Sequence, residues 1–217
     1  MEEIRAVSLI ILGWLLGILS DPIVKGIQNA RLRASLQNGL LAELVETQVN
    51  MAFIAYKLRG RLLSVTQEFL AGLQPIFESY DGPEKDERLV EAIRGLGKLT
   101  DDQLKYMHSS QNKPGRAVGL CSTSLPFLSS QVHMLSVCQP DFRQRILRIK
   151  AHVDLFNQQV MQAMGFLEKT FDQSITGDNR LAVEGNLEEG YEAVARRAEV
   201  IIDCVSELRS RYALTTH

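Results

Sequence analysis

The stretch FRQRILRIKAHVDLFNQQVMQAMGFLEKTF, residues 142–171, carries the clearest structural signal in the chain. Its apolar residues recur in alternating steps of four and three, apart from a final step of four, which is the spacing of a heptad seam. A helix with such a seam buries it against partner helices at a shallow crossing angle. The seam residues are Phe142, Ile146, Ile149, Val153, Phe156, Val160, Ala163, Leu167 and Phe171.

A second seam follows toward the C-terminus and repeats the alternation without a break. It consists of Leu187, Tyr191, Val194, Ala198, Ile201, Val205, Leu208 and Tyr212. Asp178 is placed to cap the helix that carries it. No comparable apolar alternation of period two occurs, so almost no sheet is expected. The sequence therefore predicts an all-α fold, an up-and-down bundle of four to five long helices.

The first half of the soluble part also reads as helix. One apolar pattern with helical spacing runs from Pro22, suited to a first helical turn, to about Tyr80. Glycines 39, 60 and 72 mark where a kink or break would fall. Asp81-Gly82-Pro83 should end this helix, and a shorter one should begin near Glu84.

Further elements are expected before the first seam. Thr100 and Gln103 have the spacing of a capping box. Residues 109–122 have the composition of a loop, and a helix should run from about Ser124 to Val137, with Pro126 in its first turn. Pro140 should start the helix of the first seam.

The N-terminal segment is the other strong feature. Ala6 to Leu19 is a run of fourteen residues without a charge. As a helix it would be about 21 Å long, shorter than a hydrocarbon core of about 30 Å. The flanks extend it, so that residues 4–24 could span a thin bilayer. A buried core helix and a cleaved signal peptide are the alternatives. The run is apolar all round, which disfavours a core helix, and the chain begins Met1-Glu2-Glu3 rather than with the basic residues of a signal peptide. We expect a single-pass membrane anchor over residues 1–22 and a helical bundle over residues 23–217.

Flanking charges predict the orientation of this anchor. Lys25, Arg31 and Arg33 follow the apolar run, whereas only Arg5 precedes it. Because cations are retained on the cytoplasmic side, the N-terminus should lie outside and the bulk of the chain in the cytoplasm of an inner (plasma) membrane. Gly13 and Gly17 form a GxxxG motif, through which two anchor helices could pack closely.

Composition and motifs argue against several function classes. A net charge of −2 does not favour nucleic acid as a specific partner. No GxxxxGK[ST], GxGxxG, GxSxG or HExxH occurs, and the four histidines are scattered, so neither a cofactor nor a metal is expected. The three cysteines lack metal or disulfide spacing. Cys121 with His108 or His133 as base is a nucleophile hypothesis, set against a packing role for the cysteine.

One basic constellation lies in the first seam helix. Arg143, Arg145, Arg148 and Lys150 form a basic face there, followed by His152. The spacing Arg145-x6-His152 resembles the RX4-6H element of HEPN ribonucleases, which are dimeric helical bundles. The resemblance would assign phosphate contact and acid/base work to Arg145 and His152, although Ile146 stands where that family usually has a polar residue. The alternatives are an exposed face paired with acidic residues, or contact with anionic lipid or an acidic partner.

Three functions remain open. The first is a membrane-anchored scaffold or interaction protein without enzymatic activity, of a layout that resembles small bacterial inner-membrane proteins. Its partners would be the lipid bilayer, through residues 4–24, and either another protein or a second copy. The second is a HEPN-like ribonuclease. The third is an effector of a defence or stress system whose anchor oligomerises and perturbs the bilayer.

Overall fold

The chain is helical throughout the part that the structure describes. The computed structural model describes the backbone of residues 2–83, 85–112 and 117–212, together with the side chains of Trp14 and of the residues from Pro22 onward in these ranges. No strand occurs in these ranges, which confirms the all-α prediction there. None of the helices that the described residues form has both the length and the apolar character needed to cross a membrane.

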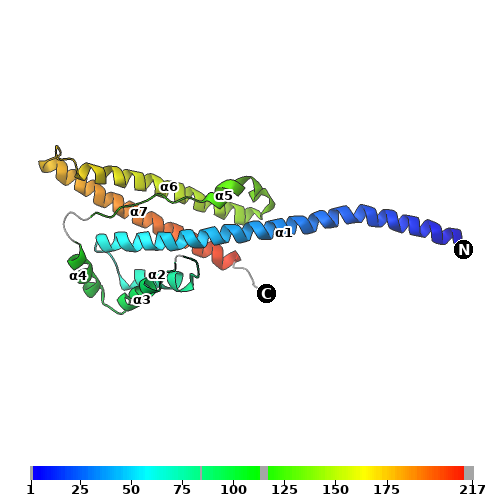
Figure 1. Cartoon of the computed structure of the whole chain (residues 1–217), viewed down its shortest axis with the longest axis horizontal. Coiled ribbons are helices and arrows are strands. Elements are labelled where there is room, and N and C mark those ends of the chain that lie inside the picture. Colours follow the sequence, from blue (N-terminus) through cyan, green and yellow to red (C-terminus); the bar gives the residue numbers. More distant parts are fainter. Residues whose placement is uncertain (1, 84, 113–116, 213–217) are drawn as a thin grey trace.

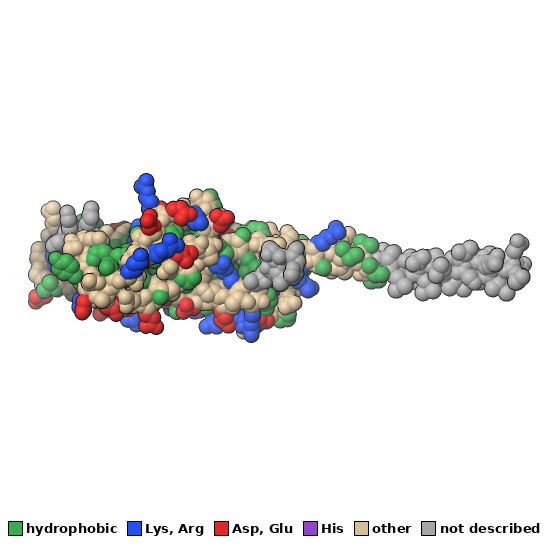
Figure 2. Space-filling model, turned by 90° about the horizontal axis from the view of Figure 1, so that it is seen from below, with side chains coloured by type: hydrophobic (Ala, Val, Ile, Leu, Met, Phe, Trp, Pro, Cys, Tyr) green, Lys and Arg blue, Asp and Glu red, His purple; other side chains and the backbone are tan. Residues whose placement is uncertain are grey.

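The first helix, α1 (Glu2–Arg61), is 60 residues long and runs through Pro22. The prediction that Pro22 starts a new helix is therefore wrong. Proline removes one backbone hydrogen bond and crowds the preceding turn, and α1 accommodates it along a curved course (Figure 1). Residues 22–35, about 21 Å of helix, are all exposed, and the first part of this segment projects beyond the core (Figures 1 and 2). Nearer the core, the Arg33 Nε donates to the Val137 carbonyl at 2.8 Å. From Leu36 onward α1 contributes to the core.

The predicted helix from Pro22 to Tyr80 is broken after Arg61. Leu63 has a φ of 56°, a left-handed conformation that a helix cannot contain. Thr66 then starts α2 (Gln67–Ser79), and its hydroxyl accepts a hydrogen bond from the Phe69 N–H at 3.2 Å. The break falls beside Gly60, one of the three marked glycines. Helix α2 ends directly before Tyr80, close to the predicted stop.

Short helices form the next part of the chain. These are α3 (Glu87–Leu96), α4 (Asp101–Gln111), α5 (Pro126–Gln131) and the 3-10 helix η1 (Val132–Val137). The capping box at Thr100 and Gln103 is present, and Pro126 occupies the first turn of α5, as predicted. Glu43 of α1 holds the start of α5, because its carboxylate accepts from the N–H groups of Phe127 at 2.6 Å and Leu128 at 2.9 Å.

The two seam helices are α6 (Pro140–Thr170) and α7 (Gly177–Tyr212). They are antiparallel: Arg145 pairs with Glu207, near the end of α7, whereas Ala163 lies beside Gly190, nearer its start. Helix α7 packs against both α1 and α6 (Figure 1). Within the described ranges three helices have 31 residues or more, and shorter helices such as α2 and α3 also contribute buried side chains to the core, so the predicted bundle of four to five long helices is not confirmed.

Both seams are buried almost as predicted. In α6 every seam residue from Phe142 to Leu167 is buried, and in α7 every one from Leu187 to Leu208. The exceptions are Tyr212, which is half-buried, and Phe171, with 71% of its surface exposed. Phe171 is the C-cap of α6, where the chain turns away before another helix can cover it. Asp178 lies inside the first turn of α7 rather than before it.

Most side chains of the predicted membrane anchor lie outside the residues that the structure describes. The side chains of residues 1–13 and 15–21, including Gly13 and Gly17, lie outside the described residues. The backbone of α1 nevertheless joins this segment to the core as one helix (Figure 1).

A close approach of α6 and α7 at Gly190 gives a first prediction. A Cβ on Gly190 would lie 3.1 Å from the Ala163 Cβ and 3.3 Å from its Cα, so no larger side chain fits there without separating the helices. We expect Gly190→Leu to lower the free energy of unfolding by about 1–3 kcal/mol in urea denaturation. Gly185→Leu is the matched control, because a Cβ there meets nothing within 4 Å. Equal stabilities of the two variants would refute the close approach.

Candidate functional site

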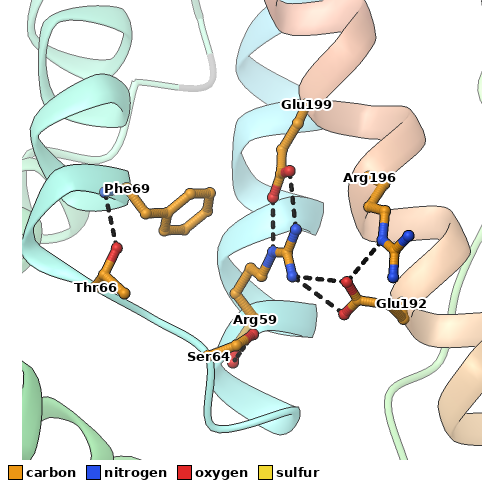
Figure 3. A network of polar contacts seen from close by, with 7 residues as sticks. All are labelled: Arg59, Ser64, Thr66, Phe69, Glu192, Arg196 and Glu199. Atoms are coloured by element: carbon orange, nitrogen blue, oxygen red, sulfur yellow. Dashed lines mark hydrogen bonds and ion pairs between the residues drawn. The ribbon is translucent and has the colours of Figure 1, made fainter.

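A network of ion pairs joins the end of α1 to α7 (Figure 3). The Arg59 guanidinium donates to both carboxylate oxygens of Glu199, at 2.7 and 2.9 Å, and to Glu192 at 3.0 Å. Glu192 also accepts from Arg196 at 2.8 Å. Hydrogen bonding to Glu199 raises the pKa of Arg59, and the pKa of Glu192 is lowered, since its two arginines outweigh the effect of its burial. This network fixes the register between α1 and α7.

A buried amide continues the α1–α7 contact toward the other end of α7. Gln48 is 1% exposed, and its amide nitrogen donates to the Ser206 hydroxyl at 2.7 Å and to the Ile202 carbonyl at 3.2 Å. Its amide oxygen accepts from Arg209 at 2.8 Å. The amide is thus satisfied on both sides, as a buried polar group must be. The polar side chains between α1 and α7 therefore hold these two helices together.

Arg145, one of the two HEPN-like positions, is held between two carboxylates. It pairs with Asp141 of its own helix at 3.0 Å and with Glu207 of α7 at 2.7 Å. Asp141 also accepts from Tyr212 at 2.8 Å and Arg211 at 3.0 Å, and these hydrogen bonds lower the pKa of Asp141. The guanidinium is therefore engaged in the contact between α6 and α7.

His152, the other HEPN-like position, contacts a second cation. Its Nδ1 lies 3.0 Å from a guanidinium nitrogen of Arg197 on α7. Burial lowers the pKa of His152, and the charges of Arg197 and Arg148 lower it further. A neutral imidazole accepting a hydrogen bond from Arg197 fits this arrangement. Of the remaining basic face, Lys150 pairs with Asp154 at 2.7 Å, while Arg143 forms no ion pair within the described ranges.

This arrangement predicts acid sensitivity near neutral pH. Because the folded-state pKa values of His152 and His108 lie below the ordinary 6.5, the unfolded chain takes up protons first as pH falls. Stability should therefore be full above pH 6.5 and decline below it. We expect a lower urea midpoint at pH about 5.5 than at pH about 7.5, and a smaller difference in His152→Gln, whose amide can still accept from Arg197. An unchanged pH dependence in this variant would exclude His152 as a source.

The nucleophile hypothesis can be compared with the position of Cys121. Cys121 is exposed, on the extended segment that follows α4, and lines a cavity with Phe53 and Lys57. His108 is buried in α4 and lines a neighbouring cavity. Among the described residues no hydrogen bond joins Cys121 to His108 or His133, and no group of three His, Cys, Asp or Glu is placed to hold a metal ion.

The network around Arg59 was not anticipated from the sequence. Glu192 and Glu199 are seven residues apart and therefore share a face of α7, which was the available signal. Nothing in the sequence pairs that face with Arg59, which is 133 residues away from Glu192. Comparisons of the chain with protein-family models, with curated proteins and with solved structures found no match.

Proposed function

We propose that this chain is a membrane-anchored helical scaffold without enzymatic activity, which holds its bundle at the cytoplasmic face of a membrane and presents helical surfaces to a protein partner or a second copy. The continuity of α1 carries the proposal, because one 60-residue helix includes both the uncharged apolar run and a wall of the core. A helix of this kind positions what it tethers, whereas a flexible linker would not.

The exposed part of α1 supports this arrangement. Ile23, Val24 and Ile27 are 48–58% exposed, directly after the apolar run. Lys25 and Arg31 are exposed in the same segment. Apolar side chains mixed with long cations suit the boundary between acyl chains and headgroups. Residues 4–24 would form about 31 Å of helix, close to the thickness of a hydrocarbon core.

The polar contacts described above support a scaffold rather than a reaction centre. The Arg59 network, Gln48 and Arg145 each join two helices of the core. Such contacts rigidify a bundle, which helps a surface built on helices to keep its shape.

Thiol labelling in bacterial spheroplasts tests the proposed topology. Cys121 is the exposed native thiol, whereas Cys138 is buried and Cys204 partly buried. We expect a membrane-impermeant maleimide to label Cys121 only after the membrane is permeabilised. Glu2→Cys in a Cys121→Ser background should be labelled in intact spheroplasts. Protection of both positions until permeabilisation would contradict a single pass with its N-terminus outside.

A further inference from the structure

A cavity lies between the end of α1, the end of α4 and the extended segment after α4. Its volume is about 480 Å³, within the range of small-ligand pockets. Asn112 ties two of its walls together, because its amide nitrogen donates to the carbonyls of Gly60 at 3.2 Å and Arg61 at 3.0 Å. The lining comprises Tyr56, Lys57, Gly60, Arg61, His108, Gln111, Asn112, Ala117, Val118 and Gly119.

The charged side chains that line this cavity are all positive. Lys57 and Arg61 contribute two cations, one turn apart on α1, and no carboxylate is among the lining residues. Within the described ranges neither cation forms an ion pair, although Lys57 lies 4.1 Å above the ring centre of Phe53. Elsewhere in the core the arginines at helix contacts, such as Arg59 and Arg145, are neutralised by two carboxylates each. The cavity is therefore locally positive in a chain whose net charge is −2.

His108 adds a polar group that lacks a partner in the described structure. The residue is 6% exposed, and its Nε2 makes no hydrogen bond within the described residues. Its imidazole lies over Gly60, where a Cβ would come within 3.0 Å of Nδ1, and packs edge-on against Tyr56 at 5.9 Å. Nε2 itself has almost no accessible surface, so the imidazole lines the cavity through its other ring atoms. A ligand in the cavity would therefore change the surroundings of the His108 ring without bonding Nε2.

We propose that this cavity binds a small oxyanion of the phosphate monoester class. Arg61 and Lys57 supply the charge, and Tyr56 and Val118 contact the organic part of the ligand. Two cations match a dianionic group better than a single carboxylate. The site would make the scaffold responsive to a soluble metabolite.

The ligand is expected to come from solution rather than from a lipid headgroup. Val24 and Arg61 are 37 residues apart on one helix, which corresponds to about 55 Å. This step alone rests on the proposed membrane anchor, because it places the cavity far from the bilayer in which residues 4–24 would lie. Binding of a phosphate group itself does not depend on the anchor.

Histidine NMR on the full chain in detergent micelles tests the proposal. The chain has four histidines, so selective 15N-histidine labelling resolves them, and His108→Gln assigns the signal of His108. Inorganic phosphate is the probe, with chloride at equal ionic strength as the reference. We expect a saturable shift of the His108 signal. Arg61→Gln should weaken phosphate binding roughly tenfold, as expected for loss of a charge-assisted contact. Lys105→Gln, an exposed cation of α4 outside the lining, should leave it unchanged.

Three outcomes would overturn the inference. The first is a His108 signal that does not shift or does not saturate, while the His133 and His152 signals report a folded chain. The second is equal weakening by Arg61→Gln and Lys105→Gln, which would indicate screening rather than a site. The third is a shift with vesicles of phosphatidylglycerol but none with inorganic phosphate, which would assign the cavity to lipid. Phosphate binding by a chain that fails the thiol-labelling test would retain the site and reject the anchor.

Discussion

Replacing Phe156 with alanine is expected to lower the free energy of unfolding by about 3–5 kcal/mol. Phe156 lies at the middle of the α6 seam and has no exposed surface. Its removal loses the transfer free energy of the ring and leaves a cavity that helices held by the Arg59 and Arg145 contacts cannot readily close. Urea denaturation followed by circular dichroism measures the effect.

Met161→Ala is the matched control for this variant. Met161 lies in the same helix but is 63% exposed, so its truncation should change stability by about 0.5 kcal/mol or less. A loss in Phe156→Ala as small as the one expected for Met161→Ala would contradict the antiparallel packing of α6 on α7. A loss of about 3–5 kcal/mol in both variants would instead indicate that α6 is covered on both faces.

The sequence predicts the buried residues of the core where they follow from the spacing of neighbouring residues. Burial of the α6 and α7 seams follows from residue spacing alone, because a heptad pattern already specifies which face of a helix is covered. The capping box at Thr100 and the helix starts at Pro126 and Pro140 are likewise matters of neighbouring residues. Phe171 departs from the pattern because burial also requires a partner helix that extends far enough.

The break after Arg61 could not be read from spacing. Leu62, Val65 and Phe69 continue the apolar pattern of α1 across the turn, so the sequence is compatible with an unbroken helix. The turn depends on Leu63, a residue type that rarely adopts positive φ. Tertiary contacts of α2 with α1 and α3 therefore outweigh local preference here.

The candidate sites also combine contacts that local sequence spacing predicts with contacts that only the fold reveals. The basic face of α6 was identified from spacing, and the pairing of Arg145 with Asp141 is a local contact between residues four apart. The contacts of Arg145 with Glu207 and of His152 with Arg197 join separate helices and needed the fold. The positive cavity was missed because its walls come from three segments, among which only Lys57 and Arg61 share a local pattern.

Membrane partition of a charged variant tests the central claim most directly. Leu12→Lys/Leu16→Lys places two cations near the middle of the uncharged run. Each lysine at the centre of a spanning helix costs about 2.5–3.5 kcal/mol, so two cost about 5–7 kcal/mol, enough to abolish insertion of a run this short. Leu155→Lys/Met161→Lys is the control, because it adds the same charge at positions of α6 that are 41% and 63% exposed.

The measurement is the fraction of protein that sediments with membranes after alkaline carbonate extraction. We expect the unmodified chain and the α6 control to remain in the pellet, and Leu12→Lys/Leu16→Lys to move to the supernatant as a folded bundle. Complete release of the unmodified chain by carbonate, or equal retention of all three proteins, would contradict anchoring through residues 4–24.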